Sequence, residues 1–335
     1  MANEPHPSID DPNAYVLYRY VPSKVAAIIF VIAFGLTTCL HVFQLVRRRT
    51  WYFLPLVIGG IFETVGFVGR FLSNKDIWAL GPYIMQSLLI LVAPALFAAS
   101  IYIILGRIML MVDGERYSLV RQKRLTRTFV AGDVLSFFMQ GAGSSIQSMG
   151  TMEDVHKGEK IIVGGLIFQL IFFTLFVVVA GDFHRRLIND IPVKKRYGPR
   201  TLLQKLRPNS RVDSSFTAVA LLPRSAVNEL PWKRHIYVLY GTSALILVRN
   251  VFRIAEYIEG NAGHLLSHEA YLYIFDALLM LTVMCLLNWI HPSEVTDLYN
   301  RRQAASLVEL RMSASSLGQH DTSYSKPKAT VQSMV

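Results

Sequence analysis

The chain has 335 residues, of which 52% are hydrophobic and 17% are charged, and its mean hydropathy is +0.36. Soluble domains carry about 25% charged residues, so this composition excludes an ordinary soluble fold and indicates a membrane protein. The net charge of +11 lies between the apolar runs, which favours a role in membrane topology over nucleic-acid binding. Cys39 and Cys285 lie inside apolar runs, where we expect buried free thiols rather than a disulfide framework.

Seven stretches are long and apolar enough to cross a bilayer, because about 20 residues at 1.5 Å each cover roughly 30 Å of hydrocarbon. In chain order they are residues 25–46, 52–72, 82–111, 129–149, 161–180, 235–258 and 271–290. The fourth is the least hydrophobic of them. The sequence therefore predicts an all-α fold, a polytopic membrane protein with a seven-transmembrane helix bundle.

Lysine and arginine predict the orientation of this bundle, since cytoplasmic loops accumulate them. With the N-terminus outside, 25 of these residues fall in cytosolic segments and five in outer segments. The expected parts are an extracellular N-tail (1–24), a transmembrane domain (25–290) with the cytosolic loop 182–234, and a disordered cytosolic tail (291–335). Topology and attraction to anionic membrane lipids explain the basic clusters, and the loop or tail is also a candidate site for a cytosolic regulatory partner.

Charged side chains in the second and sixth spans follow single helical faces. Glu63 and Arg70 are seven residues apart, and Arg249, Arg253 and Glu256 are spaced by four and then three, so each set shares a face. Buried charges cost several kcal/mol unless they are partnered, so such placement indicates a built polar interior.

Asp276 in the seventh span and Gln86 in the third lie at a similar depth. Three arginines and three carboxylates in this layer predict one ion-pair network joining the second, sixth and seventh helices, because arginine favours bidentate carboxylate partners. We expect that neutralising Glu63 or Asp276 leaves a buried arginine unpaired. The network either only holds the helices together or also contacts the charged head of an amphipathic ligand.

The fourth span carries a polar stripe along its whole length. Its members are Asp133, Ser136, Gln140, Ser144 and Gln147, spaced at +3, +7, +11 and +14. Such a stripe cannot face lipid. It therefore either hydrogen-bonds to neighbouring helices or lines a hydrophilic groove through which a head group passes.

Enzymatic interpretations fail because the residues that they need are missing. The sequence holds no Gly-Lys-Ser/Thr phosphate loop and no HExxH pattern, and the seventh span has no lysine for a retinal Schiff base. His41 and His291, near the ends of predicted spans, are too few for a seven-helix zinc hydrolase. We expect no catalytic residues, no metal and no cofactor.

Several segments together resemble the fungal lipid-translocating exporter family, over residues 20–292. They are GGIFETVGFVGR (59–70), AGDVLSFFMQGAG (131–143), RNVFRIAEYIEG (249–260), SHEAYLYIFDALLM (267–280) and the HP at His291. The resemblance implies a seven-helix protein, usually of the plasma membrane or else of endomembranes, linked to transport of and resistance to amphipathic lipids and toxic sterols. This chain departs from the family at Phe67, where a tyrosine is common.

The leading hypothesis is a translocator that exports amphipathic lipids such as sphingoid long-chain bases. The alternative is a seven-helix receptor or regulator that senses such lipids and acts on transport indirectly. Without a nucleotide site, any pumping would draw on a gradient, and facilitation without one is also open. The candidate substrate-binding residues are Glu63, Arg70, Gln86, Asp133, Gln140, Arg249, Arg253, Glu256 and Asp276.

Overall fold

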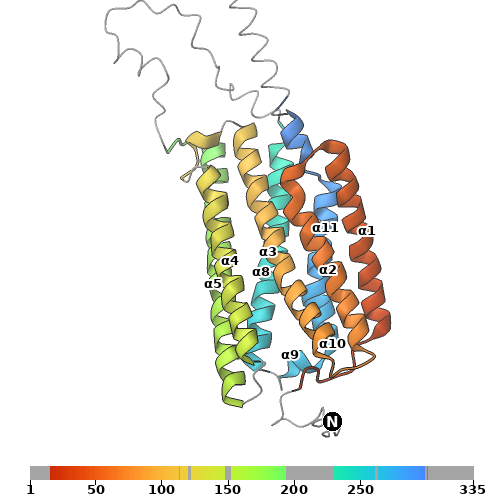
Figure 1. Ribbon diagram of the computed structural model, residues 1–335. Coiled ribbons are helices and arrows are strands. Elements are labelled where there is room, and N and C mark those ends of the chain that lie inside the picture. Colours follow the sequence, from red (N-terminus) through yellow and green to blue (C-terminus); the bar gives the residue numbers. More distant parts are fainter. Residues whose placement is uncertain are drawn as a thin grey trace, which may run out of the picture.

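The computed structural model describes residues 16–112, 114–119, 122–147, 152–193, 230–260, 263–298 and 300. Within these residues the chain is helical and contains no strand (Figure 1). Most of the predicted N-tail, of the cytosolic loop and of the C-terminal tail lies outside them.

Six long helices and one composite helix form an elongated bundle (Figure 1). The long helices are α1 (Lys24–Arg48), α2 (Leu54–Ser73), α3 (Leu80–Met111), α4 (Gln122–Gln147), α5 (Met152–Asn189) and α8 (Trp232–Glu259). After the short helix α9 (His264–Ser267), the last segment combines α10 (Glu269–Leu272), the π-helical turn η4 (Tyr273–Ala277) and α11 (Leu278–Trp289). Each predicted span coincides with one of these seven segments, which confirms the predicted fold class.

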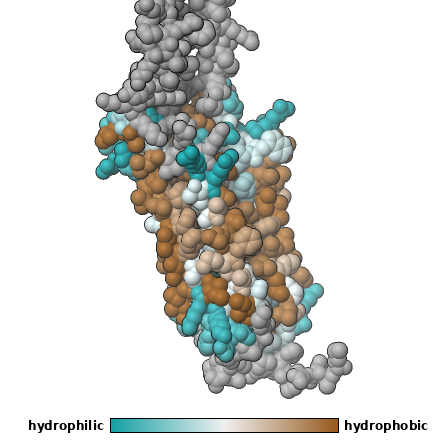
Figure 2. Space-filling model, turned by 60° about the vertical axis from the view of Figure 1, so that its left-hand side comes forward, coloured by the Kyte–Doolittle hydropathy of each residue, from teal (hydrophilic) through white to brown (hydrophobic). Residues whose placement is uncertain are grey.

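Six of the segments described by the structure are long and apolar enough to cross a membrane, and α4 is the exception. The polar stripe lowers the mean hydropathy of α4. This helix packs closely along α5 (Figure 1). The face shown in Figure 2 carries a hydrophobic belt between two hydrophilic ends. Exposed side chains such as Leu36 of α1 and Val178 of α5 belong to this belt, as expected for a multi-pass membrane protein. The orientation of the bundle remains a prediction from the charge distribution.

The expectation that both cysteines are buried is wrong. Cys39 on α1 and Cys285 on α11 are exposed on the surface of membrane-spanning helices. A thiol behaves as a small apolar group, so it is tolerated where a side chain faces lipid.

Glycines allow two pairs of helices to approach closely. A Cβ atom on Gly66 of α2 would lie 2.7 Å from a side-chain carbon of Ile90 on α3. A Cβ atom on Gly143 of α4 would lie 2.8 Å from the carbonyl oxygen of Gly158 on α5. Close backbone contact of this kind is the usual way in which membrane helices associate, and it fixes the α2–α3 and α4–α5 pairs that frame the polar interior.

Candidate functional site

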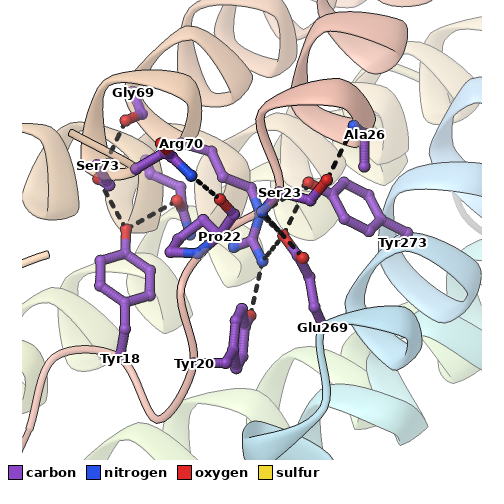
Figure 3. A network of polar contacts seen from close by, with 12 residues as sticks. Tyr18, Tyr20, Pro22, Ser23, Ala26, Gly69, Arg70, Ser73, Glu269 and Tyr273 are labelled. Atoms are coloured by element: carbon purple, nitrogen blue, oxygen red, sulfur yellow. Dashed lines mark hydrogen bonds and ion pairs between the residues drawn. The ribbon is translucent and has the colours of Figure 1, made fainter. Parts of the chain in front are cut away.

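The buried guanidinium of Arg70 is the centre of an outer polar cluster (Figure 3). Its Nη2 lies 2.8 Å from Oε1 of Glu269 and donates a hydrogen bond of 2.7 Å to the hydroxyl of Tyr20. Its Nε donates to the hydroxyl of Tyr273 at 3.0 Å. The Glu269 carboxylate also accepts the backbone N–H of Ser23, at 2.9 and 3.0 Å. These contacts join α2, α10 and the chain that precedes α1.

Residues 16–23, here called the N-terminal strap, bind across this end of the bundle (Figure 3). The Tyr18 hydroxyl lies 2.9 Å from Oε1 of Gln86 and 3.0 Å from Oγ of Ser73. Burial raises the pKa of Tyr18 to about 12, so its hydroxyl stays neutral and able to donate at physiological pH. The last part of the predicted N-tail (1–24) is therefore held against the helices.

Deeper in the bundle, two arginines of α8 form an inner polar cluster. Arg249 donates from Nε to Asp276 Oδ1 and from Nη2 to the carbonyl oxygen of Ile90, the latter at 3.0 Å. Arg253 donates from Nη1 to Glu256 Oε2 at 2.6 Å, and the same Nη1 lies 3.8 Å from Asp276 Oδ2. The π-helical turn places Asp276 between the two guanidinium groups, and such turns are frequent at functional sites.

The single network expected from the sequence is wrong in two respects. Arg70 pairs with Glu269, which the sequence places in an outer loop, and the contacts of Arg70 form a cluster separate from those of Arg249 and Arg253. Glu63 is fully buried, but within the described residues neither of its carboxyl oxygens makes a hydrogen bond or an ion pair. Neutralising Glu63 therefore leaves no arginine unpaired, contrary to the expectation.

The polar stripe of α4 divides into two parts. In the first part, Asp133 Oδ2 accepts a hydrogen bond of 2.8 Å from Tyr102 of α3, and Gln140 Nε2 donates one of 3.1 Å to Gln169 of α5. These buried groups bind α4 to its neighbours. In the second part, Ser144 and Gln147 are half-buried and border a cavity.

Two adjoining hollows lie beside the inner polar cluster. The first, here called the polar cavity, has a volume of about 80 Å³ and is lined by Arg253, Glu256 and Gln86, with Glu159 of α5 and the strap. The second, here called the apolar groove, has a volume of about 360 Å³ and lies between α3 and α4.

The two hollows share part of their lining, namely Leu17, Tyr83, Ser87, Gln147 and Tyr257. Leu80, Ile84 and Leu88 of α3 also line the groove, and each is exposed on the lipid-facing surface. A polar compartment therefore lies next to an apolar one that opens towards lipid, and the two share a wall.

Of the predicted site residues, the polar cavity brings together Arg70, Gln86, Arg253 and Glu256. Arg249 and Asp276 lie behind it in the inner cluster, and Glu63 is buried near both. Asp133 and Gln140 instead lie at the interfaces of α4 with α3 and α5. Among the described residues, no group of three or more histidines, cysteines or carboxylates is placed to hold a metal.

The sequence interpretation missed several residues of the site. They are Tyr18, Tyr20, Tyr83, Tyr257, Glu159 and Glu269. Tyr18 and Tyr20 carry no periodic signal, because the strap meets the helices only in the folded bundle. Tyr257 lies four residues after Arg253 on α8, and this spacing was the available signal for it. Glu269 lies inside the quoted segment SHEAYLYIFDALLM, which was the available signal for it.

Comparisons with known proteins identify a family for this chain. Residues 56–298 match the family described as "RTA1 like protein". The chain is 32% identical over 307 residues to "Protoporphyrin uptake protein 1" of Saccharomyces cerevisiae, covering 81% of this chain and 90% of that protein. It is 30% identical over 293 residues to "Protein RTA1" of the same yeast, covering 80% of this chain and 82% of that protein.

A more distant relative is named for lipid transport. The chain is 24% identical over 277 residues to the "Sphingoid long-chain base transporter RSB1" of Saccharomyces cerevisiae, covering 81% of this chain and 72% of that protein. No solved structure matches the chain. The family match covers most of the chain and all but the first of its long helices, so this multi-pass membrane protein belongs to the RTA1-like family.

Proposed function

We propose that this protein translocates amphipathic lipids, such as sphingoid long-chain bases, across the plasma membrane and thereby confers resistance to them. It acts as a transporter and changes no covalent bond of its substrate. The observation that carries this proposal is that the polar cavity and the apolar groove adjoin and share a wall. A molecule with a polar head and a long apolar tail matches both compartments at once.

The polar cavity offers groups that suit the head of a sphingoid base. Glu159 and Glu256 supply carboxylates for an ammonium group, and Gln86 and Gln147 supply amide groups for hydroxyls. Arg253 also lines the cavity and balances part of the negative charge of these carboxylates. The head would therefore exchange its water for charge-assisted hydrogen bonds when it enters.

The apolar groove supplies the route for the tail. Its α3 side includes three apolar side chains spaced about one helical turn apart, namely Leu80, Ile84 and Leu88, and all three are exposed to lipid. A tail can thus enter sideways from the bilayer while the head passes beside Gln147. The strap, through Leu17 and Tyr18, covers the end of the polar cavity that we predict to face outside.

The names of the relatives support transport at the level of the family, since one is described as an uptake protein and another as a sphingoid base transporter. The alternative is a lipid-sensing regulator that would use the same two hollows to bind its ligand. The two functions differ in one respect, because a translocator needs no other protein to move lipid between leaflets.

This difference is tested with purified protein in liposomes. A fluorescent sphingoid base added to the outer leaflet should reach the inner leaflet faster than in protein-free liposomes. The same assay with a phospholipid of identical tail length reports selectivity for the head. Equal rates with and without protein, under several ion gradients, would refute translocation and favour the regulator.

A further inference from the structure

Glu63 differs from the acids of the two polar clusters because it has no cation of its own. Each of the three arginines in this region has a carboxylate partner: Arg70 pairs with Glu269, Arg249 with Asp276 and Arg253 with Glu256. Among the described residues, the two polar clusters together with Glu63 therefore hold four carboxyl groups and three guanidinium groups. Glu63 is the fourth carboxyl, and both of its oxygens are buried without a hydrogen-bond partner among the described residues.

The surroundings of Glu63 do not favour a charged carboxylate. The charged groups that act on it are Asp276 of η4, which repels it, and Arg249 and Arg253 of α8, which are already paired. The neighbouring part of α2 faces Thr38 of α1 and Ile90 of α3, which do not titrate. A buried carboxyl in this position is expected to neutralise by binding a proton, because an unpaired charge in a low-dielectric interior is very costly.

We propose that Glu63 is a proton-carrying group and that lipid movement is coupled to its loss and gain of a proton. This inference rests on the proposed function and adds the source of energy. One proton enters from the side with the higher proton concentration and binds the Glu63 carboxylate. This proton leaves Glu63 towards the opposite side of the membrane when one cationic head group crosses in the other direction. One positive charge moves each way, so the exchange is electroneutral.

The inner polar cluster connects Glu63 to the substrate. Arg253 lines the polar cavity, and its Nη1 lies 3.8 Å from Asp276 Oδ2, an oxygen that makes no hydrogen bond within the described residues. An ammonium head that binds Glu256 competes with Arg253 for that carboxylate. Arg253 is then free to approach the acids behind it, and its positive charge favours release of the Glu63 proton.

Polar groups also continue from this cluster towards the other end of α8. The amide of Asn250 and the hydroxyl of Ser243 are buried, and none of their side-chain polar atoms has a hydrogen-bond partner among the described residues. They are seven residues apart and therefore share one helical face. A proton released by Glu63 therefore meets polar side chains along this face. They lie on its way to the end of the bundle that we predict to be cytosolic.

The protonation of Glu63 is tested directly by infrared spectroscopy of the purified protein. The wild type should show the carbonyl-stretching band of a buried protonated carboxyl, and Glu63→Gln should lose it. Asp182→Asn is the matched control, because Asp182 is ion-paired with Arg186 at 2.6 Å and should contribute no such band. An unchanged band in Glu63→Gln would overturn the proposal.

Thermal unfolding gives a second readout that does not need transport. Glutamine is a neutral isostere of a protonated glutamate, so Glu63→Gln should keep the melting temperature of the wild type. Asp276→Asn removes the partner of Arg249 and should lower it. A loss of stability in Glu63→Gln as large as in Asp276→Asn would show that Glu63 is charged and would overturn the proposal.

The coupling is tested in liposomes with an imposed pH gradient. The wild type should move the labelled sphingoid base faster with the gradient, and Glu63→Gln should move it at the same rate with and without it. Equal gradient dependence in both proteins would overturn the coupling and leave translocation intact. No lipid movement by the wild type under any gradient would refute the proposed function and the coupling together, while the infrared band still decides whether Glu63 holds a proton.

Discussion

At the scale of single residues, Asp276 is the acid on which both arginines of α8 converge. Its carboxylate is 1% exposed, accepts a hydrogen bond from Arg249 and lies 3.8 Å from Nη1 of Arg253. Truncating or neutralising one partner of a buried ion pair leaves the other charge uncompensated. The loss of folding stability is therefore far larger than for an ion pair at the surface.

We predict that Asp276→Asn destabilises the protein by about 3–5 kcal/mol, because the Arg249 guanidinium stays buried without its carboxylate. The measurement is thermal unfolding in detergent, read by the temperature at which the purified protein aggregates. Asp182→Asn serves as the control. The Asp182 carboxylate is partly exposed, so neutralising it should lower the stability of the protein much less. Equal melting temperatures for the two variants would contradict the pairing described here.

The outer cluster shows how one arginine holds the strap in place. The Arg70 guanidinium reaches Glu269, Tyr20 and Tyr273 from one planar group, which the single ammonium of lysine cannot do. We predict that Arg70→Lys keeps the positive charge but loosens the strap. Limited proteolysis near Tyr20 should become faster in this variant than in the wild type. An unchanged cleavage rate would mean that the charge alone holds the strap.

At the scale of helices, the two parts of the α4 stripe make opposite predictions for access by water. Single cysteines at Asp133 and Gln140 should stay unlabelled by a small water-soluble thiol reagent, because these positions are engaged by α3 and α5. Cysteines at Ser144 and Gln147 should react, because these positions border the hollows.

The control for this experiment is Leu135, which is exposed on the lipid-facing side of α4 and should stay unlabelled. Cys39 and Cys285 must be replaced first. Labelling should come from the side of the membrane that carries the strap, and a sphingoid base should slow it at Ser144. Labelling at Asp133 and Gln140 as well as at Ser144 and Gln147 would instead indicate a groove along the whole helix.

Hydropathy was enough to predict every long helical segment of the bundle except α4, because a lipid-facing helix must satisfy its backbone internally and cover its length with apolar side chains. It did not predict the ion-pair partners. Arg70 and Glu269 are 199 residues apart, and their contact depends on how α10 meets α2. The π-helical turn at Asp276 and the bound strap likewise follow from tertiary contacts that helical periodicity does not report. Periodicity did identify Arg249, Arg253 and Glu256 as one face, because all three lie on a single regular helix.

At the scale of the whole molecule, the orientation of the bundle decides which side the strap and the polar cavity face. The distribution of lysine and arginine predicts that the C-terminus is cytosolic. A protease-sensitive tag after Val335 should therefore be protected in intact cells, and one before Pro5 should be cleaved. Permeabilised cells provide the control in which both tags are cleaved. Cleavage of the C-terminal tag in intact cells would reverse the assignment.

The central claim is that a lipid passes with its head in the polar cavity and its tail in the apolar groove. Leu88→Trp fills the groove between α3 and α4, whereas Ile171→Trp adds the same side chain on the lipid-facing surface of α5, away from both hollows. Both positions face lipid, so both variants should fold.

The decisive measurement is the rate at which these two purified variants move a labelled sphingoid base across liposome membranes. The account predicts that Leu88→Trp slows movement by at least about tenfold, the equivalent of 1.4 kcal/mol on the barrier, while Ile171→Trp keeps the wild-type rate. Equal rates for Leu88→Trp and Ile171→Trp, with both proteins folded, would contradict the claim that the groove carries the lipid tail.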